Sequence, residues 1–313
     1  MSGTLRIGLI GWGTVGSALG LLIAQGPVRV QLVALAVRDP SRGRATPLPA
    51  GVPLMSPPEL IREAEIVVEV VGGVDAALDW ARDSLTRGRA YVTANKALLA
   101  THGALLAELA TGHGGALLAS ASVGGGAPMI ELVAHLAATG RIERLRGVLN
   151  ATTTFMLSTM ARGNTYAQAL QAAQDAGYAE ADPTFDVEGR DAAQKLAILA
   201  SVAWGGWRSE SEVERQGIVG IRLEPGATVR LVAEATPERM TVRPMRLPPS
   251  SPLAGVSGVA SGLVVELTDT DPHLLVGPGA GGRATAGALY ADLARLSAGE
   301  RPILFAPRHG AIG

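Results

Sequence analysis

Short, continuously apolar runs alternate with amphipathic stretches over the first 120 residues of the chain. Continuous aliphatic runs are typical of strands that are buried on both faces of a parallel sheet, and the stretches between them carry apolar residues at helical spacing. The alternation therefore predicts an α/β domain in which helices cover both faces of a parallel sheet. Strands are expected over residues 5–10, 28–37, 65–71, 90–93 and 116–119, and helices over 15–24, 75–87 and 97–110.

The pattern changes after Ser120, which indicates a second domain of different construction. A glycine-rich turn at 122–128 precedes an expected helix, and prolines interrupt several β-rich stretches in the last third of the chain. The segment 40–58 is rich in Pro, Arg and Gly and is expected to be a surface connection. Beyond residue 120, helices are expected over 129–138, 166–174, 189–204 and 285–296, a strand over 141–149, and further strands within 228–267.

Composition narrows the class of protein. The 313 residues are 47% hydrophobic and 18% charged, so the chain can bury a sizeable core, and its length predicts two domains of roughly 150 residues each. A net charge of −1 disfavours a broad basic face and, with it, a nucleic-acid partner. Without cysteine there are no disulfides, thiolate nucleophiles or cysteine-ligated metals, and the five scattered histidines include no close pair for a metal. No signal-peptide pattern or membrane-span pattern is present, so a cytoplasmic protein that binds no membrane is expected.

A glycine-rich motif, Gly11-Trp-Gly13-Thr-Val-Gly16, stands where the first expected strand passes into the first expected helix. Gly11 permits the tight turn, Gly13 lets the backbone approach a pyrophosphate, and Gly16 lets the helix pack closely on the strand. The start of the helix then offers unpaired N–H groups to the anion. A glycine-rich turn without a ligand is the alternative, and the strand, the helix and the β–α rhythm around the motif favour dinucleotide binding.

Acidic side chains and one lysine gather in the second half of the chain. Glu180 and Asp182 are expected on a loop, and Asp186 follows on the way into a helix that carries Asp191 and Lys195. A spacing of four residues puts the last two side chains on the same face of that helix. Such a pocket could hold a substrate ammonium group and present the lysine as a proton donor. A solvated salt bridge explains the spacing equally well, and both interpretations stay open at this point.

Two further polar stretches follow expected strands. Thr93-Ala-Asn95-Lys96 lies at the carboxyl end of a strand, where α/β proteins bind their ligands. A lysine at the start of a helix is usually a solvated charge, although the helix dipole disfavours it there, so its position at this edge makes Lys96 a candidate site residue. The hydroxyl groups of the second stretch, 150–154, could bind a ligand or cap a helix.

In their order along the chain, these motifs resemble those of the homoserine dehydrogenase family. The glycine-rich start is shared by many dehydrogenases, whereas the block from Glu180 to Lys195 is specific to this family. The resemblance covers nearly the whole chain and is carried by residues 11–16, 93–96, 121–128, 148–153, 177–183, 186, 189, 191, 195 and 277–281, with Thr285 after them.

The resemblance implies a dimeric enzyme that interconverts L-homoserine and L-aspartate 4-semialdehyde with NAD(P), in threonine and methionine biosynthesis. It also implies a Rossmann-type nucleotide-binding domain over 1–122 and 283–313, which the C-terminal helix completes. The residues between, 123–282, are then an α+β catalytic and dimerisation domain with a mixed sheet.

Site residues follow from the same resemblance, position by position. Lys195 matches the family's proposed acid/base lysine, and Lys96 matches the lysine near the nicotinamide and the substrate. A protonated lysine suits this reaction, because negative charge grows on the aldehyde oxygen as hydride reaches the carbon. The resemblance and the motifs together give Glu180, Asp186, Asp191 and Thr152 as substrate-binding residues, and Gly11, Gly13, Thr14, Val15, Gly16, Arg38, Thr93, Lys96 and Gly279 as cofactor-binding residues.

The chain departs from the family pattern in three places. Ser120 stands where the family usually has a glutamate that helps to hold a monovalent metal ion, which leaves at most a weak ion site at the backbone of Val123 and Gly125. Ala151 replaces a glycine, so a close approach of the backbone is altered there. The stretch 217–229 is shorter than usual. With neither an amino-acid-sensing domain nor a fused aspartate kinase expected, feedback by threonine through such a domain is not expected either.

Two alternative functions remain at this stage. One is a related dehydrogenase that acts on another small amino-acid aldehyde, which a panel of substrates would distinguish. The other is a catalytically silent paralogue that binds NADP as a sensor, an idea supported by Ser120 and Ala151. Retention of Lys96, Glu180, Asp191 and Lys195 argues against the sensor, because a sensor needs no acid/base set.

The first prediction concerns the choice between NADP and NAD. Arg38 comes about twenty residues after the glycine motif, where the adenosine ribose is expected, and a guanidinium can pair with a 2′-phosphate through two hydrogen bonds. Arg42 and Arg44 add positive charge, whereas Asp39 is the residue that could instead favour NAD. We expect kcat/KM to be higher with NADPH than with NADH, and Arg38→Ala to collapse that ratio. Preference for NADH, or a ratio that does not respond to the substitution, would end the assignment.

Overall fold

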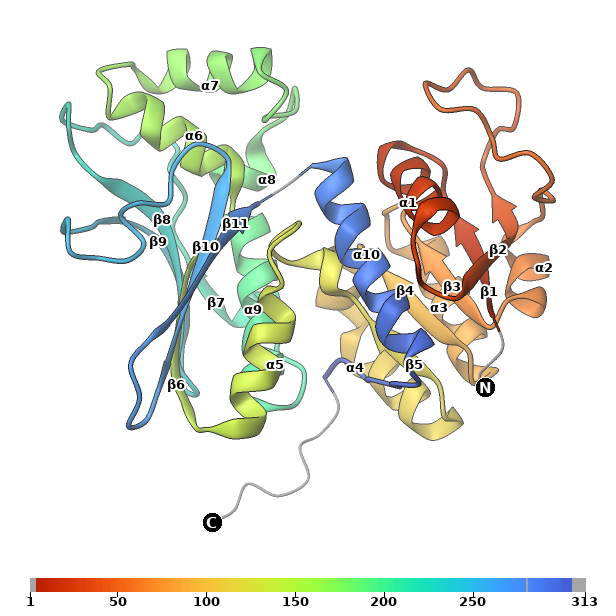
Figure 1. Ribbon diagram of the computed structural model, residues 1–313. Coiled ribbons are helices and arrows are strands. Elements are labelled where there is room, and N and C mark those ends of the chain that lie inside the picture. The colour runs from red at the N-terminus through yellow and green to blue at the C-terminus, as the bar shows by residue number, and fades with distance from the viewer. Residues whose placement is uncertain (1–3, 280, 306–313) are drawn as a thin grey trace. The chain divides into compact units, whose positions relative to one another are not determined.

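The computed structural model describes residues 4–279 and 281–305. The chain forms two compact units, the first built from Met1–Gly125 and Gly281–Gly313 and the second from Gly126–Ala280. Figure 1 shows that each unit has its own sheet and its own helices. Residues 1–3 and 306–313, which the sequence assigned to the nucleotide-binding domain, lie outside the described residues.

A five-stranded parallel sheet forms the centre of the first unit (Figure 1). Its strands are β1 (Leu5–Ile10), β2 (Val30–Ala36), β3 (Ile66–Glu69), β4 (Ala90–Thr93) and β5 (Ala116–Leu118), in the spatial order β2-β1-β3-β4-β5. Strands β3, β4 and β5 are buried at every position, as continuous apolar runs predict. Strand β2 lies on one side of β1, whereas β3, β4 and β5 follow on its other side, so the strand order reverses between β1 and β3. The carboxyl ends of these two strands therefore form the crevice where such sheets bind ligands.

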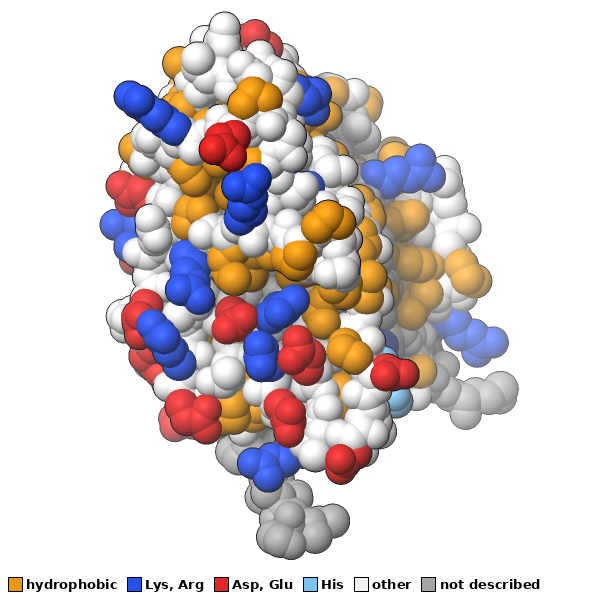
Figure 2. All heavy atoms as spheres, turned by 90° about the vertical axis from the view of Figure 1, so that its left-hand side faces the viewer, with side chains coloured by type: hydrophobic (Ala, Val, Ile, Leu, Met, Phe, Trp, Pro, Cys, Tyr) orange, Lys and Arg blue, Asp and Glu red, His pale blue; other side chains and the backbone are white. Residues whose placement is uncertain are grey.

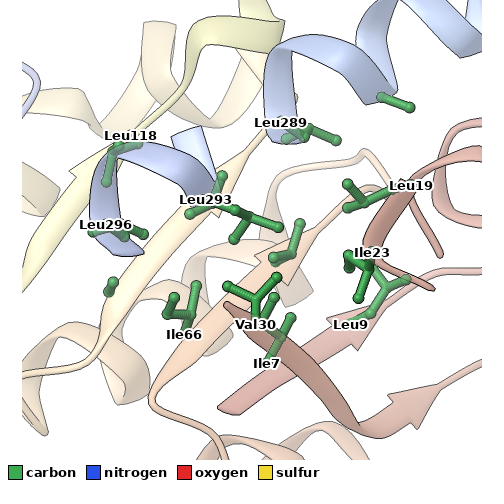
Figure 3. Packing of buried hydrophobic residues seen from close by; sticks show 14 of the residues in the cluster. Ile7, Leu9, Leu19, Ile23, Val30, Ile66, Leu118, Leu289, Leu293 and Leu296 are labelled. Atoms are coloured by element: carbon green, nitrogen blue, oxygen red, sulfur yellow. The ribbon is translucent and has the colours of Figure 1, made fainter. Parts of the chain in front are cut away.

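The helix nearest the C-terminus completes the core of the first unit. Helix α10 (Gly282–Ser297) packs on α1 (Thr14–Gln25) and on the short 3-10 helix η1 (Ser120–Ser122). Figure 3 shows Leu289 and Leu293 of α10 in the same apolar cluster as Leu19 and Ile23 of α1. The other helices of this unit are α2 (Pro57–Glu63), α3 (Asp75–Thr86) and α4 (Lys96–His113).

The second unit contains a six-stranded mixed sheet, as the family resemblance implied. Its strands are β6 (Ile142–Val148), β7 (Val213–Arg215), β8 (Val229–Ala235), β9 (Met240–Arg246), β10 (Ala260–Leu267) and β11 (His273–Pro278), in the order β11-β10-β6-β8-β9-β7. Neighbours are antiparallel except β7 and β9, which pair in parallel.

Helices cover one face of this mixed sheet. Helix α9 (Arg190–Trp204) is buried along nearly its whole length, because it contacts β6, β8 and β9 as well as α5 (Met129–Thr139). Its many alanines allow that close packing. On the opposite face, Val148, Val232 and Val264 pack against Leu253 and Val256 of the segment before β10. The remaining helices are α6 (Ala151–Met160), α7 (Tyr166–Asp175), α8 (Thr184–Val187) and the 3-10 helix η2 (Glu210–Glu212).

Several elements differ from the sequence prediction. Helix α2 was not predicted; it begins at the last two residues of the expected surface connection, where Ser56 and Glu59 form a capping box around Pro57. Strand β11 includes Pro278, and it is an edge strand, where proline is tolerated because no partner needs its N–H group. Helix α6 was missed because threonine has a low helix propensity. Asp186, expected on a loop, lies in the one-turn helix α8.

Among the described residues, the helices are all too short or too polar to cross a membrane.

Candidate active site

The glycine-rich turn links β1 to α1. Gly11 has a φ of +111°, which side-chain-bearing residues rarely adopt, and a Cβ on Gly16 would lie 2.2 Å from the carbonyl oxygen of Gly11. Around Gly13, a Cβ would meet no atom within 4 Å. Gly13 also occupies the N-cap position of α1, where it has no side chain to bond the first N–H groups of Thr14, Val15 and their neighbours. The turn is therefore open where an anion can reach backbone donors.

Trp12, inside the same motif, holds the turn to a distant segment. Its indole Nε1 donates to the carbonyl oxygens of Thr46 (3.2 Å) and Pro47 (3.1 Å). Its ring also covers Gly20, where a Cβ would lie 2.3 Å from a ring carbon. No pattern in the sequence predicts this role of Trp12, since an aromatic residue inside a glycine motif does not reveal its partner. The contact fixes the segment 40–58 beside the turn.

The loop after β2 is closed by its own polar groups. Asp39 Oδ1 accepts hydrogen bonds from the backbone N (2.9 Å) and the hydroxyl (2.6 Å) of Ser41, which lower the pKa of Asp39. The guanidinium of Arg44 donates to the carbonyl oxygens of Asp39 (2.5 Å), Pro40 (3.2 Å) and Arg42 (2.7 Å). Arg38 is exposed at the start of this loop. Asp39, the acid that could favour NAD, therefore uses its Oδ1 to bond Ser41 in its own loop.

A buried glutamate organises the carboxyl ends of β3 and β4. Glu69 is fully buried; its Oε1 accepts from the backbone N atoms of Val71 (2.7 Å) and Gly72 (2.9 Å), and its Oε2 accepts from the Thr93 hydroxyl (2.8 Å). Thr93, also fully buried, accepts in turn from the backbone N of Asn95 (2.9 Å). Glu69 was missed by the sequence analysis, which treated it as part of an apolar strand. It fixes the loops at the crevice.

Lys96 is the first residue of α4 and is half-buried. Asn95 caps this helix, since its Oδ1 accepts from Leu98 N (3.1 Å) while its Nδ2 donates to the carbonyl oxygen of Gly73 (2.5 Å). The backbone at Lys96 is therefore held on both sides.

Ser120 meets a carboxylate that comes from the opposite end of the sequence. Its backbone N donates to Asp292 Oδ2 (3.0 Å) and its hydroxyl to Asp292 Oδ1 (2.5 Å). Asp292 belongs to α10 and is fully buried. Val123 is buried in the turn that follows, and Gly125 has a φ of +60°. This buried carboxylate, which the sequence pattern does not reveal, anchors η1 to α10. The second glycine-rich turn, at 122–128, starts from η1.

In the second unit, Asp191 and Lys195 form a buried ion pair. Lys195 Nζ lies 2.7 Å from Asp191 Oδ2, and the two side chains are only 8% (Asp191) and 12% (Lys195) exposed. The same Nζ donates to the carbonyl oxygen of Leu149 (2.9 Å). The alternative of a solvated salt bridge is therefore wrong. Burying both charges costs desolvation energy that only close partners offset.

Asn150 joins this pair to a second carboxyl group. Its Oδ1 caps α6 by accepting from Thr153 N (2.8 Å), and its Nδ2 donates to Asp191 Oδ2 (2.8 Å) and Asp186 Oδ1 (2.6 Å). Thr152 Oγ1 lies 2.9 Å from Asp186 Oδ2. Burial, and next the charge of Asp191, raise the pKa of Asp186. We call Asn150, Thr152, Asp186, Asp191 and Lys195 the Asn150 cluster. The helix cap here is an amide rather than the expected hydroxyl.

Two predicted residues lie outside this cluster. Glu180 is exposed on the loop between α7 and α8, whose backbone is held by a hydrogen bond from Gln174 Nε2 to the Glu180 carbonyl oxygen (3.2 Å). The Phe155 and Tyr178 rings, 5.1 Å apart, pack the same loop onto α6. Gly279 packs in the second unit, where a Cβ would lie 2.2 Å from Ser261 Oγ.

The predicted site residues thus form a set in each unit. The cofactor candidates Gly11 to Gly16, Thr93 and Lys96 lie at the carboxyl edge of the parallel sheet, with Arg38 on the loop after β2. The substrate candidates Thr152, Asp186 and Asp191 share one hydrogen-bonded network with Lys195. The first set offers donors to a phosphate anion, and the second holds an ammonium group that can give a proton. Sequence analysis missed Trp12, Glu69, Asn150 and Asp292.

Comparison with protein families gives two matches that together span most of the chain. The family model described as homoserine dehydrogenase matches residues 128–294. The model described as homoserine dehydrogenase, NAD binding domain, matches residues 11–119.

Individual relatives and solved structures agree with these matches. The homoserine dehydrogenase of Synechocystis sp. is 33% identical over 96% of this chain and 76% of its own length, and that of Corynebacterium glutamicum is 35% identical over 92% and 70%. The crystal structure of a homoserine dehydrogenase from Thiobacillus denitrificans has a TM-score of 0.88 at 33% identity, over 94% of this chain and 73% of that one. A hyperthermophilic archaeal homoserine dehydrogenase in complex with NADPH has a TM-score of 0.85 at 29% identity, over 96% and 99%.

The second prediction concerns monovalent cations. Ser120 offers a neutral oxygen where the family usually has a carboxylate, so the set at Ser120, Val123 and Gly125 would hold a cation only weakly. We expect activity at constant ionic strength to be the same in Na⁺, K⁺ and tetramethylammonium salts. Strong activation by Na⁺ or K⁺ alone would show instead that the backbone carbonyls of Val123 and Gly125 suffice.

Proposed function

This chain belongs to the homoserine dehydrogenase family, and we propose that it performs the family's reaction with Lys195 as the acid/base group and Asp191 as its counter-ion. The enzyme is an NAD(P)-dependent oxidoreductase that acts on a CH–OH group and interconverts L-homoserine and L-aspartate 4-semialdehyde, a step of threonine and methionine biosynthesis. The observation that carries the proposal is the buried contact of 2.7 Å between Lys195 Nζ and Asp191 Oδ2.

The nicotinamide, when bound, supplies or accepts the hydride at the reacting carbon. Lys195 handles the proton on the oxygen. An ammonium group has three hydrogens, and Asp191 Oδ2 and the carbonyl oxygen of Leu149 accept two of them. The third is then available to the substrate oxygen, where it offsets the growing negative charge and is transferred as the aldehyde is reduced. In the oxidation of homoserine, neutral Lys195 takes the hydroxyl proton, and Asp191 favours the charged lysine that results.

Two acidic groups of the second unit are candidates to hold the ammonium group of the amino-acid substrate. We propose that Glu180 and Asp191 attract the substrate ammonium group, because both are carboxylates of the same unit and Glu180 is exposed to incoming ligand. Lys96 is proposed to serve nicotinamide and substrate from the first unit. Asp186 and Thr152 bond to each other, so we propose that they shape the site rather than attract the substrate ammonium group.

NADP is the cofactor we propose, with NAD as the alternative. The open turn at Gly13 fits a pyrophosphate, and Arg38 is exposed on the loop where the adenosine ribose is expected. Asp39 is engaged with Ser41, which favours the arginine as the group that meets the ribose. The archaeal relative was solved with NADPH. The first unit is accordingly proposed as the nucleotide-binding domain, and a cytoplasmic location is proposed because a chain without cysteine suits a reducing compartment.

We further propose that the second unit forms a homodimer through the part of the sheet face opposite the helices that is formed by β6, β10 and the edge strand β11. On that face, Leu274 and Val276 of the edge strand β11 are 50% and 48% exposed. Arg144 and Arg146 pair there with Glu266, at 3.4 Å and 3.8 Å. Figure 2 looks at the second unit from this side and shows hydrophobic side chains exposed beside basic and acidic ones. A face with apolar area and both charges can complement a second copy of itself.

The third prediction tests the role of Lys195. Lys195→Ala removes the proton donor, so kcat should fall by roughly 10²-fold or more while the Kd for NADPH stays close to wild type. Stopped-flow oxidation of NADPH with aspartate semialdehyde measures the first quantity, and fluorescence titration measures the second. Near-normal turnover in this variant would return the pair to a purely structural role.

The fourth prediction tests the dimer. We expect light scattering to give twice the chain mass for the wild type, and Leu274→Arg to shift the population towards monomer because it buries an unpaired charge. Leu21→Arg is the matched control, since Leu21 is 52% exposed on α1 of the other unit. A monomeric wild type, or equal effects of the two variants, would refute this interface.

A further inference from the structure

Asn150 is a buried amide to which neither the sequence motifs nor the proposed reaction gives a role beyond capping α6. It is 3% exposed and lies between β6 and the start of α6. The two ends of the amide have different partners. The oxygen accepts from Thr153 N (2.8 Å) and from the Thr153 hydroxyl (2.9 Å). The nitrogen faces Asp186 and Asp191, which are acceptors when ionised, so the orientation of the amide follows from its partners.

Leu149 and Asn150 together form hydrogen bonds with both members of the ion pair. The carbonyl oxygen of Leu149 takes one hydrogen of Lys195 Nζ (2.9 Å), and Asn150 Nδ2 gives one hydrogen to Asp191 Oδ2 (2.8 Å). The oxygen that accepts from Asn150 is the one that contacts Lys195. Two successive residues after β6 therefore fix the position of the ammonium and the position of its counter-ion, which a helix alone would leave to side-chain rotation.

The hydrogens around Asp186 can be counted. Thr152 Oγ1 lies 2.7 Å from the carbonyl oxygen of Tyr178 and 2.9 Å from Asp186 Oδ2. A carbonyl oxygen only accepts, so the single hydrogen of the Thr152 hydroxyl goes to Tyr178. A protonated Asp186 would supply the hydrogen that the contact between Thr152 and Asp186 then lacks. The other oxygen of that acid, Oδ1, accepts the second amide hydrogen of Asn150 (2.6 Å).

We propose that Asn150 is the positioning residue of the Lys195–Asp191 pair, and that Asp186 is held beside it as a neutral acid whose proton completes a chain through Thr152 to the carbonyl of Tyr178. The proposal rests on the role proposed above for Lys195. In this arrangement Asn150 lies between the Asp191 carboxylate and the neutral Asp186. The opposite charges of Asp191 and Lys195 then cancel, and Asp186 adds none.

The surrounding charges support a protonated Asp186. Burial, then the Asp191 carboxylate, raise its pKa, and these outweigh the hydrogen bonds from Asn150 and Thr152 and the charge of Lys195. Asp191 and Lys195 both belong to α9, whereas α6 carries no charged residue. Glu180 and Asp182, on the loop before α8, lie at the surface of the unit. A raised pKa means that the neutral form persists to higher pH and is lost as pH rises through it.

Ionisation of Asp186 would break this arrangement. Thr152 would turn its hydrogen to the new carboxylate and leave the carbonyl of Tyr178, so the loop that carries Glu180 would lose a tie to α6. Asn150 would then stand between two anions. The wild-type kcat/KM for homoserine should therefore contain a falling component as pH rises through the pKa of Asp186.

Replacing Asp186 with asparagine tests the protonation state. An asparagine can copy a neutral acid, since its nitrogen donates to Thr152 and its oxygen accepts from Asn150. We expect Asp186→Asn to lose the falling component of the pH profile of kcat/KM, because the side chain that it introduces cannot ionise. Asp175→Asn, on an exposed carboxylate of α7, is the matched control and should keep the wild-type profile. An infrared band of a protonated carboxyl group should be present in wild type and absent from Asp186→Asn.

Replacing Asn150 with aspartate tests the positioning. Aspartate caps a helix as well as asparagine does, so Asn150→Asp retains α6, but the ionised carboxylate that it introduces gives no hydrogen to Asp191. We expect this variant to lower kcat by about 10²-fold, the scale of a misplacement of about 1 Å, with recovery towards low pH as the new carboxyl takes up a proton. Asn164→Asp is the control, because Asn164 is exposed and its amide nitrogen donates to the backbone carbonyl oxygen of Thr159 (3.0 Å).

The outcomes separate this inference from the proposed function. If Lys195→Ala keeps its turnover, the role of Lys195 fails, and the inference fails with it. If Lys195→Ala is inactive but Asp186→Asn keeps the falling component of the pH profile, or the wild type lacks the infrared band of a protonated carboxyl group, the assignment of Asp186 as a neutral acid is wrong. A loss in Asn150→Asp that does not change with pH, or no loss at all, overturns the positioning role.

Discussion

The buried ion pair of Lys195 and Asp191 is the interaction on which the second unit depends. Removing two charges from water costs more free energy than their mutual attraction gains, unless hydrogen bonds from other polar groups stabilise the pair as well. Here the carbonyl of Leu149 and the amide of Asn150 do so. This requirement accounts for the asparagine at the N-cap of α6 and for the contact of the alanine-rich α9 with the residues that follow β6. Catalytic chemistry and local folding are satisfied by the same few hydrogen bonds.

The first unit solves a similar problem with two buried carboxylates. Glu69 accepts two backbone N–H groups and one hydroxyl, and Asp292 accepts one backbone N–H and the hydroxyl of Ser120. Hydrogen bonds to an ionised acceptor are stronger than those between neutral groups, so one side chain can order a loop that has little apolar surface. Glu69 thereby bonds Thr93, one of the residues expected to meet the cofactor, whereas Asp292 orders η1 at Ser120.

The sequence predicted most elements because their signals are local. Continuous aliphatic runs gave the parallel strands, and the spacing of Asp191 and Lys195 gave their common face on α9. What it could not predict depends on contacts between distant residues. Asn150 meets Asp186 and Asp191 across 36 and 41 residues, Trp12 reaches Pro47 across 35, and Ser120 finds Asp292 across 172. A buried glutamate at the end of a strand and an asparagine before a helix look ordinary until the fold supplies their partners.

The return of α10 to the first unit has a consequence for synthesis on the ribosome. The second unit is one continuous segment, Gly126–Ala280, so all its strands and helices have been made before α10 appears. The first unit, by contrast, lacks Leu289, Leu293 and Leu296 of its core, and the partner of Ser120, until the last part of the chain emerges. The interrupted unit therefore reaches its complete core after the inserted one has its full sequence, and a nascent chain exposes the apolar side of α1 during that interval.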